Sequence, residues 1–129
     1  MSKQSKLLEV LLQLLEEYDN IQAVIESLPR GYISTKVISG HTYHYRQWRE
    51  GSHVLSTYVP DALLNSVKQK IVIRKQNEEL LKVLKADIKK NEKALIKAGV
   101  LTDESAKALR NATAEERLEI VKYCKFCKK

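Results

Sequence analysis

The scarcity and placement of glycine and proline constrain this chain more than any other feature. Only four glycines and two prolines occur among 129 residues, and they leave two long stretches uninterrupted. Residues 1–28 precede Pro29, and residues 61–98 lie between Pro60 and Gly99. Both stretches are rich in residues with good helix propensity, such as Leu, Lys and Glu. The spacing therefore predicts two long helices with a segment of different character between them.

The first stretch carries apolar residues at alternating steps of four and three, the pattern of a heptad seam. They are Leu7, Leu11, Leu14, Tyr18, Ile21, Ile25 and Leu28. Leu8, Leu12 and Leu15 widen this face, so we expect the helix to pack on more than one neighbour. Polar residues interrupt the apolar run, which argues against a signal peptide or a membrane span.

The segment at residues 32–59 is rich in β-branched and aromatic residues and predicts three antiparallel strands. Two-residue hairpin turns fit Ser39-Gly40 and either Glu50-Gly51 or Gly51-Ser52. Such turns fix the faces of the sheet, because side chains alternate along a strand. One face then holds Tyr32, Lys36, Tyr43, Tyr45, Gln47, Arg49 and Tyr58. The other holds Ile33, Thr35, Val37, His44, Arg46, Trp48, Leu55 and Val59, and is expected to be the core face.

The second long helix is expected to extend roughly 57 Å, against about 33 Å for the first, at 1.5 Å per residue. The first helix cannot cover it, so either the carboxyl segment folds back along it or a second chain does. Thr102 is expected to cap one short helix, and Thr113 with Glu116 to form a capping box for another, within residues 102–124. A basic tail follows at residues 125–129.

A homodimer through the long helix is the coiled-coil alternative. Leu80, Leu84, Ile88 and Leu95 form a partial seam with Asn91 at a seam position. The expected fold class is α+β and mostly α: an N-terminal helix, a three-stranded antiparallel sheet of two hairpins, one long helix and short C-terminal helices. We expect residues 1–129 to form a single domain.

The motif Cys124-Lys-Phe-Cys127 has the spacing of a metal knuckle, but it supplies only half a zinc site. The only imidazoles are His41, His44 and His53, and His41 and His44 are expected on opposite faces of the sheet. We therefore predict no metal and no cofactor. Two cysteines build no disulfide framework, which favours a cytoplasmic protein.

Motifs for catalysis are missing from the sequence, including a phosphate loop, a dinucleotide fingerprint, a zincin helix and a nucleophile elbow. The acidic residues are scattered along amphipathic helices rather than paired for acid and base chemistry. We expect a protein that is not an enzyme.

The net charge of +7 is unevenly distributed along the chain. Residues 1–28 carry two basic and five acidic residues, whereas residues 61–98 carry ten basic and five acidic ones. Part of the long helix is thus expected to present a cationic stripe.

Cations beside flat phenol rings suit nucleic acid, because the cations neutralise phosphates and the rings stack on bases. The sequence predicts a binding surface for DNA or RNA on the tyrosine-rich face and the neighbouring helix. Its residues are Tyr32, Lys36, Tyr43, Tyr45, Gln47, Arg49, Tyr58, Lys68, Arg74 and Lys75. The alternatives are a protein-binding adaptor or inhibitor that uses the long helix or the tail, and a wholly structural role for this face.

The central residues also carry a resemblance. Leu28-Pro29-Arg30-Gly31, followed by the series Tyr43, Tyr45, Gln47, Trp48, Arg49, Glu50 and Gly51, resembles a family of short prokaryotic and mobile-element proteins without an established activity. In that family a tyrosine-rich hairpin lies between two helices. The resemblance implies that such a chain, as a mobile-element or phage protein, could block or assist a host defence or nucleic-acid-processing machine. The third strand departs from the family pattern because residues 53–58 contain no lysine.

Overall fold

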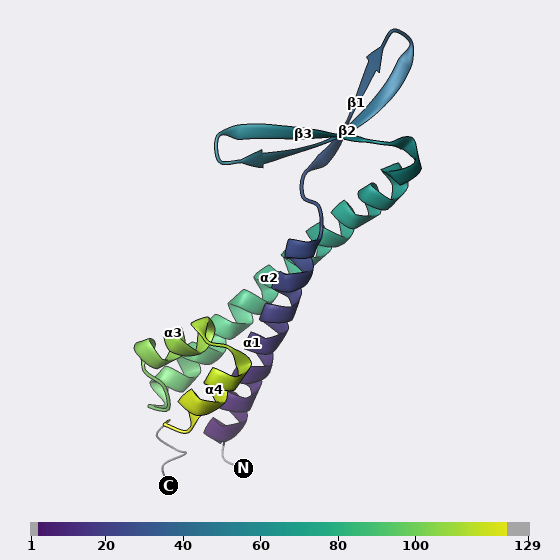
Figure 1. Ribbon diagram of the computed structural model, residues 1–129. Helices are drawn as coiled ribbons and strands as arrows, with labels where there is room; N and C mark the ends of the chain where they lie inside the picture. The colour runs from purple at the N-terminus through teal and green to yellow at the C-terminus, as the bar shows by residue number, and fades with distance from the viewer. Residues whose placement is uncertain (1–2, 124–129) are drawn as a thin grey trace. The chain divides into compact units, whose positions relative to one another are not determined.

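The computed structural model describes residues 3–123 (Figure 1). The elements in chain order are α1 (Lys3–Ser27), β1 (Tyr32–Ile38), β2 (His41–Glu50), β3 (His53–Val59), α2 (Asp61–Lys97), α3 (Asp103–Asn111) and α4 (Ala114–Val121). This order confirms the predicted α+β class, with its two long helices, three strands and short C-terminal helices. Cys124, Cys127 and the basic tail at 125–129 lie outside the described residues.

The chain forms two compact units. The first, the helical unit, comprises Met1–Ile21 and Leu81–Lys129, and the second, the sheet unit, comprises Gln22–Leu80. Helices α1 and α2 contribute residues to both. That the whole chain folds as one cooperative domain stays a prediction.

The core of the helical unit joins four segments of chain. Buried residues of α1 and α2 pack with residues of the loop before α3 and of α3 itself: Leu8, Leu11, Leu15, Ile88, Leu95, Val100, Leu101, Ala106 and Leu109. The wide apolar face predicted for the first helix is therefore used by more than one neighbour. The carboxyl segment folds back, which was one of the two predicted ways of covering the long helix.

The predicted coiled-coil seam is divided between burial and exposure. Leu84, Ile88 and Leu95 are buried, whereas Leu80 is 47% exposed. Asn91 donates from Nδ2 to the Asp87 carbonyl oxygen of its own helix at 3.0 Å. A homodimer through α2 stays a prediction.

Both short helices begin at the predicted caps. Thr102 Oγ1 accepts from the Ser105 backbone N–H at 3.1 Å, and Ser105 Oγ accepts from the Thr102 backbone N–H at 2.8 Å. Thr113 and Glu116 form the same reciprocal pair at the start of α4. These bonds satisfy N–H groups that have no partner inside a helix.

The sheet has the order β1-β2-β3 and is antiparallel throughout. Ser39 and Gly40 have φ values of 50° and 82°, as a two-residue hairpin turn requires, and Gly51 has φ 60° in the second turn. Because both turns have two residues, the register follows the predicted parity. Tyr32 pairs with Gln47, Lys36 with Tyr43, and Tyr45 with Tyr58, so the predicted tyrosine-rich face is confirmed.

The opposite face is a core face at only one position. Val59 is 4% exposed, but Leu55 is 36% and Val37 is 70% exposed. The guanidinium of Arg46 lies 3.9 Å from the ring centroid of Trp48. A cation from the same face of the sheet therefore covers the indole.

Candidate nucleic-acid interface and arginine pocket

The tyrosine face of the sheet consists of Tyr32, Lys36, Tyr43, Tyr45, Gln47, Arg49 and Tyr58. Its residues come from all three strands and are aligned by the register described above. Tyr58 is central, since its ring meets the edges of Tyr43 and Tyr45 at centroid distances of 6.4 and 5.9 Å. Edge-to-face contacts of this kind hold the rings in defined orientations.

Polar contacts fix two further members of this face. Lys36 Nζ lies 5.1 Å from the ring centroid of Tyr45, within range of a cation–π contact. Tyr32 donates its hydroxyl proton to Gln47 Oε1 at 2.7 Å. The face is thus ordered by its own contacts and needs no layer of helices above it.

The tyrosine face is open and has no acidic side chain. Tyr32 is 54% and Tyr58 is 51% exposed, and Lys36 and Arg49 are also exposed. The only carboxylate in residues 32–59 is Glu50, which pairs with His53 on the opposite face. The positive charges of Lys36 and Arg49 are therefore not cancelled within the face.

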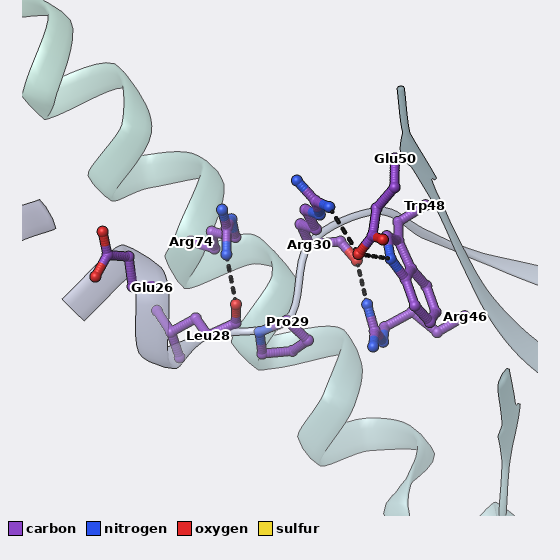
Figure 2. Close-up of a pocket in the computed structure, with 8 residues that line it drawn as sticks. All are labelled: Glu26, Leu28, Pro29, Arg30, Arg46, Trp48, Glu50 and Arg74. Carbon is purple, nitrogen blue, oxygen red and sulfur yellow. Dashed lines mark hydrogen bonds and ion pairs between the residues drawn. The ribbon is translucent and has the colours of Figure 1, made fainter. Parts of the chain in front are cut away.

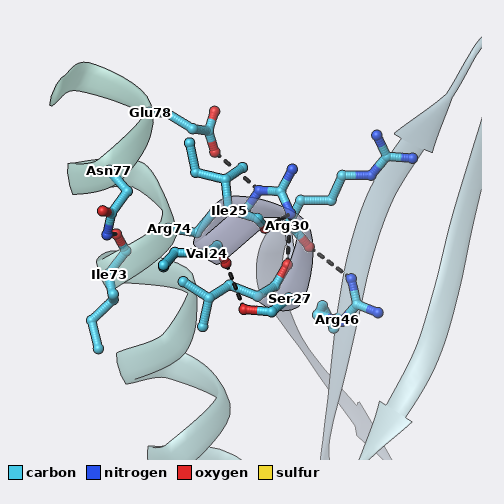
Figure 3. Close-up of polar contacts among 10 residues, drawn as sticks. Val24, Ile25, Ser27, Arg30, Arg46, Ile73, Arg74, Asn77 and Glu78 are labelled. Atoms are coloured by element: carbon cyan, nitrogen blue, oxygen red, sulfur yellow. Dashed lines mark hydrogen bonds and ion pairs between the residues drawn. The ribbon is translucent and has the colours of Figure 1, made fainter. Parts of the chain in front are cut away.

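The three predicted binding residues of α2 differ from one another. Lys68 and Lys75 are exposed on the helix, as a phosphate contact requires. The Arg74 side chain is only 17% exposed, and its Nε donates to Glu78 Oε1 at 3.1 Å. Arg74 Nη1 also reaches the end of α1, where it donates to the carbonyl oxygens of Ile25 at 2.7 Å and Leu28 at 2.6 Å. Figure 3 shows Arg74 beside Ile25 and Glu78.

Arg74 thus caps the C-terminal end of α1 and does not lie on the tyrosine face. The last carbonyl groups of a helix have no partner within it, and a guanidinium can supply several N–H donors at once. Arg74 stays in the predicted nucleic-acid contact set, with Nη2 as the group that these hydrogen bonds leave over among the described residues. Lys68 and Lys75 remain in that set as predictions.

A second site in the sheet unit was not predicted from the sequence. An open pocket of about 390 Å³ lies where the end of α1, the segment before β1, β2 and α2 meet. Figure 2 shows the residues that line it. We call it the arginine pocket; its lining residues are Glu26, Leu28, Pro29, Arg30, Arg46, Trp48, Glu50 and Arg74. Three guanidinium groups converge here from three parts of the chain.

Backbone and side-chain contacts organise the arginine pocket. Arg46 Nη1 donates to the Arg30 carbonyl oxygen at 2.8 Å, which ties β2 to the segment after α1. The Glu50 carboxylate accepts from Arg30 Nη2 at 3.1 Å and from Trp48 Nε1 at 3.2 Å. Burial, followed by the positive charges of Arg30 and Arg74, lowers the pKa of Arg46. Three arginines and two glutamates line the pocket, which leaves an excess of one positive charge among its lining residues.

Gly31 brings the chain close enough to form this pocket. Its φ is 105°, and a Cβ atom at this position would overlap the Gln47 carbonyl oxygen. The signal in the sequence was the glycine directly after Pro29-Arg30, but nothing in the sequence indicated which strand it approaches.

Two other classes of site receive no support from this structure. Within residues 3–123, no three His, Cys, Asp or Glu side chains are grouped so that they could hold a metal ion. In the same residues, neither long helix is apolar enough to cross a bilayer.

The fold and sites define a small helical protein with a three-stranded sheet that presents aromatic and cationic side chains on one face. The chain belongs to the family described as Domain of unknown function (DUF6788), whose model matches residues 4–69. The match includes nearly all of α1, the whole sheet and the first part of α2, so it extends beyond the hairpin segment that suggested a family. No curated protein and no solved structure matches the chain.

Proposed function

We propose that this protein is a non-enzymatic nucleic-acid-binding module whose contact surface is the tyrosine face. The observation that carries the proposal is the joint exposure of tyrosine rings and uncancelled cations on one face of the sheet. Lys36 and Arg49 are suited to the phosphate backbone, and Tyr32 and Tyr58 to base stacking. Lys68 and Lys75 would extend the phosphate contacts along α2.

Two effects would add to the free energy of binding. Each cation that neutralises a phosphate releases condensed counterions, which makes the affinity fall as salt rises. Exposed rings add stacking that tolerates different base sequences, because every base has a π-face. Stacking on Tyr32 and Tyr58 favours a single strand of DNA or RNA, whose bases are free to reach the rings.

The test is fluorescence anisotropy with labelled single-stranded and duplex oligonucleotides over a salt series. The double variant Lys36→Gln/Arg49→Gln should bind more weakly and show a shallower salt dependence than the wild type. A matched control is Lys6→Gln/Lys107→Gln, which removes the same charge from exposed positions of the helical unit. Absence of binding at low salt, or equal loss in both double variants, would rule the proposal out.

A second function is favoured by apolar exposure on α2. Ile73 and Leu80 lie seven residues apart, on the same side of the helix, and are 44% and 47% exposed. A protein partner or a second copy of the chain could cover them, as expected for an adaptor or an inhibitor of a nucleic-acid-processing machine from a host or a mobile element. Affinity capture before and after nuclease treatment separates the two functions, because only a protein partner is retained after nuclease. Light scattering of the purified chain reports a homodimer directly.

A further inference from the structure

We propose that the arginine pocket is a binding site for a phosphate monoester. The site is independent of the tyrosine face, because Arg46, Trp48 and Glu50 lie on the opposite face of the sheet. It follows from three guanidinium groups that line one open cavity of about 390 Å³.

Unused donors in this pocket supply the first argument. A guanidinium has five N–H donors. Within residues 3–123, Arg46 uses one of them, on the Arg30 carbonyl oxygen, and Arg30 uses Nη2 on Glu50. Arg74 uses Nε and Nη1, which leaves its Nη2 group without a partner among the described residues. Each of the three arginines therefore retains donors that an oxyanion could accept.

Preorganisation of Arg46 supplies the second argument. Its guanidinium is held at one end by the Arg30 carbonyl oxygen and lies against the Trp48 ring at 3.9 Å. Stacking covers the faces of a guanidinium but leaves its edge open, and the edge binds phosphate through two parallel hydrogen bonds. Little side-chain entropy would be lost when an anion binds to a group that is already fixed.

Glu50 supplies the third argument, because its carboxylate already acts as an anion in this pocket. It accepts from both Arg30 and Trp48, and its side chain is 55% exposed, so it can yield to another anion (Figure 2). Glu26 also lines the pocket, so two carboxylates stand against three guanidinium groups, and Arg74 is further paired with Glu78 outside the lining. A phosphate monoester carries close to two charges at neutral pH and has three acceptor oxygens, which matches the remaining donors better than a further carboxylate does.

Glu50 is therefore a built-in competitor for the phosphate. Replacing it with glutamine removes the negative charge, while the Gln oxygen can still accept from Trp48 Nε1. Phosphate affinity should then rise. A purely structural role for the arginine cluster predicts no such increase.

The experiment is isothermal titration calorimetry of the full chain with inorganic phosphate, at constant ionic strength set by chloride. Wild type should bind phosphate, Glu50→Gln should bind it several-fold more tightly, and Arg46→Gln should lose about tenfold or more, the effect of removing a charge-assisted pair. Arg30→Gln is a second loss variant that keeps the backbone carbonyl used by Arg46. Lys107→Gln, a matched charge loss at an exposed position of the helical unit, should leave phosphate affinity unchanged. Circular dichroism of each variant establishes that the fold is retained.

A competition arm identifies the source of the phosphate. A 5′-phosphorylated oligonucleotide that displaces inorganic phosphate better than its 5′-hydroxyl counterpart would place a nucleic-acid end in the pocket. If neither oligonucleotide displaces it, the ligand is a small phosphorylated molecule, and equal displacement by both would refute the monoester proposal, because the 5′-hydroxyl strand carries only phosphodiesters. The proposal fails if wild type and Glu50→Gln both give no phosphate binding, or if Lys107→Gln weakens binding as much as Arg46→Gln. Either failure leaves the salt-dependent binding by the tyrosine face unaffected.

Discussion

Arg117 of α4 donates from Nη1 to Asp19 of α1 at 2.8 Å, although the Arg117 side chain is only 4% exposed. Its Nε also donates to the Leu109 carbonyl oxygen at 2.8 Å. One buried guanidinium thus joins three helices of the helical unit. Asp19 is half exposed, so solvent screens part of the ion pair, and the buried hydrogen bond to Leu109 contributes more.

Replacing Arg117 with Met should destabilise the protein by roughly 2–3 kcal/mol, because the buried Leu109 carbonyl loses a charged donor. Chemical denaturation followed by circular dichroism measures the change. Lys122→Met is the control, since the pair between Lys122 and Glu119 is two-thirds exposed on both sides and exposed pairs contribute little. Equal effects of the two substitutions would contradict the role assigned to Arg117.

Glu92 should give stability a pH dependence. Burial raises its pKa, while Arg110 at 3.0 Å, together with Lys89, lowers it by a smaller amount. A raised pKa means that the folded chain holds the proton more tightly than the unfolded chain, so this contribution to stability is lost as pH rises through the folded pKa. Compared with the wild type, Glu92→Gln should therefore gain stability as pH increases from the usual glutamate range, and then reach a constant difference. Denaturation of both proteins across a pH series tests this, and a difference that does not vary with pH would refute it.

Alanine substitutions at Gly31 and Gly40 should separate two contributions to the loss of stability: the strained backbone conformation and the steric overlap of a Cβ atom. Both have positive φ, but only Gly31 has backbone atoms where a Cβ would lie, whereas Gly40 has open space. Gly40→Ala should cost about 1 kcal/mol from the left-handed conformation alone. Gly31→Ala should cost roughly 2 kcal/mol or more, since the segment must also move away from Gln47. Thermal denaturation that ranks Gly40→Ala as the more damaging change would show that the approach to β2 is not tight.

The contributions of ring stacking and of positive charge to binding by the tyrosine face should be separable by mutation. Tyr58→Ala should weaken single-strand binding by about 1–3 kcal/mol for a stacked base and leave the slope of log affinity against log salt unchanged. Lys36→Gln should reduce the magnitude of that slope on duplex by about 0.9. Tyr123→Ala is the control for ring loss, since Tyr123 is 74% exposed but belongs to the helical unit. The interface would need reassignment if Tyr123→Ala had the larger effect.

Local signals in the sequence predicted much of this fold. Two-residue turns at Ser39-Gly40 and Gly51-Ser52 fix the register, and the register alone places the seven residues of the tyrosine face together. Thr102 and Thr113 mark helix starts because their hydroxyl groups act within three residues. These features depend on short stretches of chain, which a sequence displays directly.

Contacts between distant residues were not predicted. The hydrogen bonds from Arg74 to Ile25 and Leu28 join positions 49 and 46 residues apart, and no local pattern distinguishes this arginine from the neighbouring lysines. The core face was overestimated for the same reason, because the sequence does not show that Arg46 stacks on Trp48. Arg30 and Glu50 were visible as a motif, but their pairing depends on the close approach at Gly31.

The hydrogen bonds from Arg74 also mean that α1 is fully capped at its C-terminal end only in a chain that extends at least to residue 74. The family model ends at residue 69, five residues before this arginine. During synthesis, the carbonyl groups of Ile25 and Leu28 cannot form these hydrogen bonds until residue 74 has left the ribosome. A fragment cut at residue 69 would leave both carbonyl groups to water, so the end of α1 would lack the two hydrogen bonds that hold it to α2.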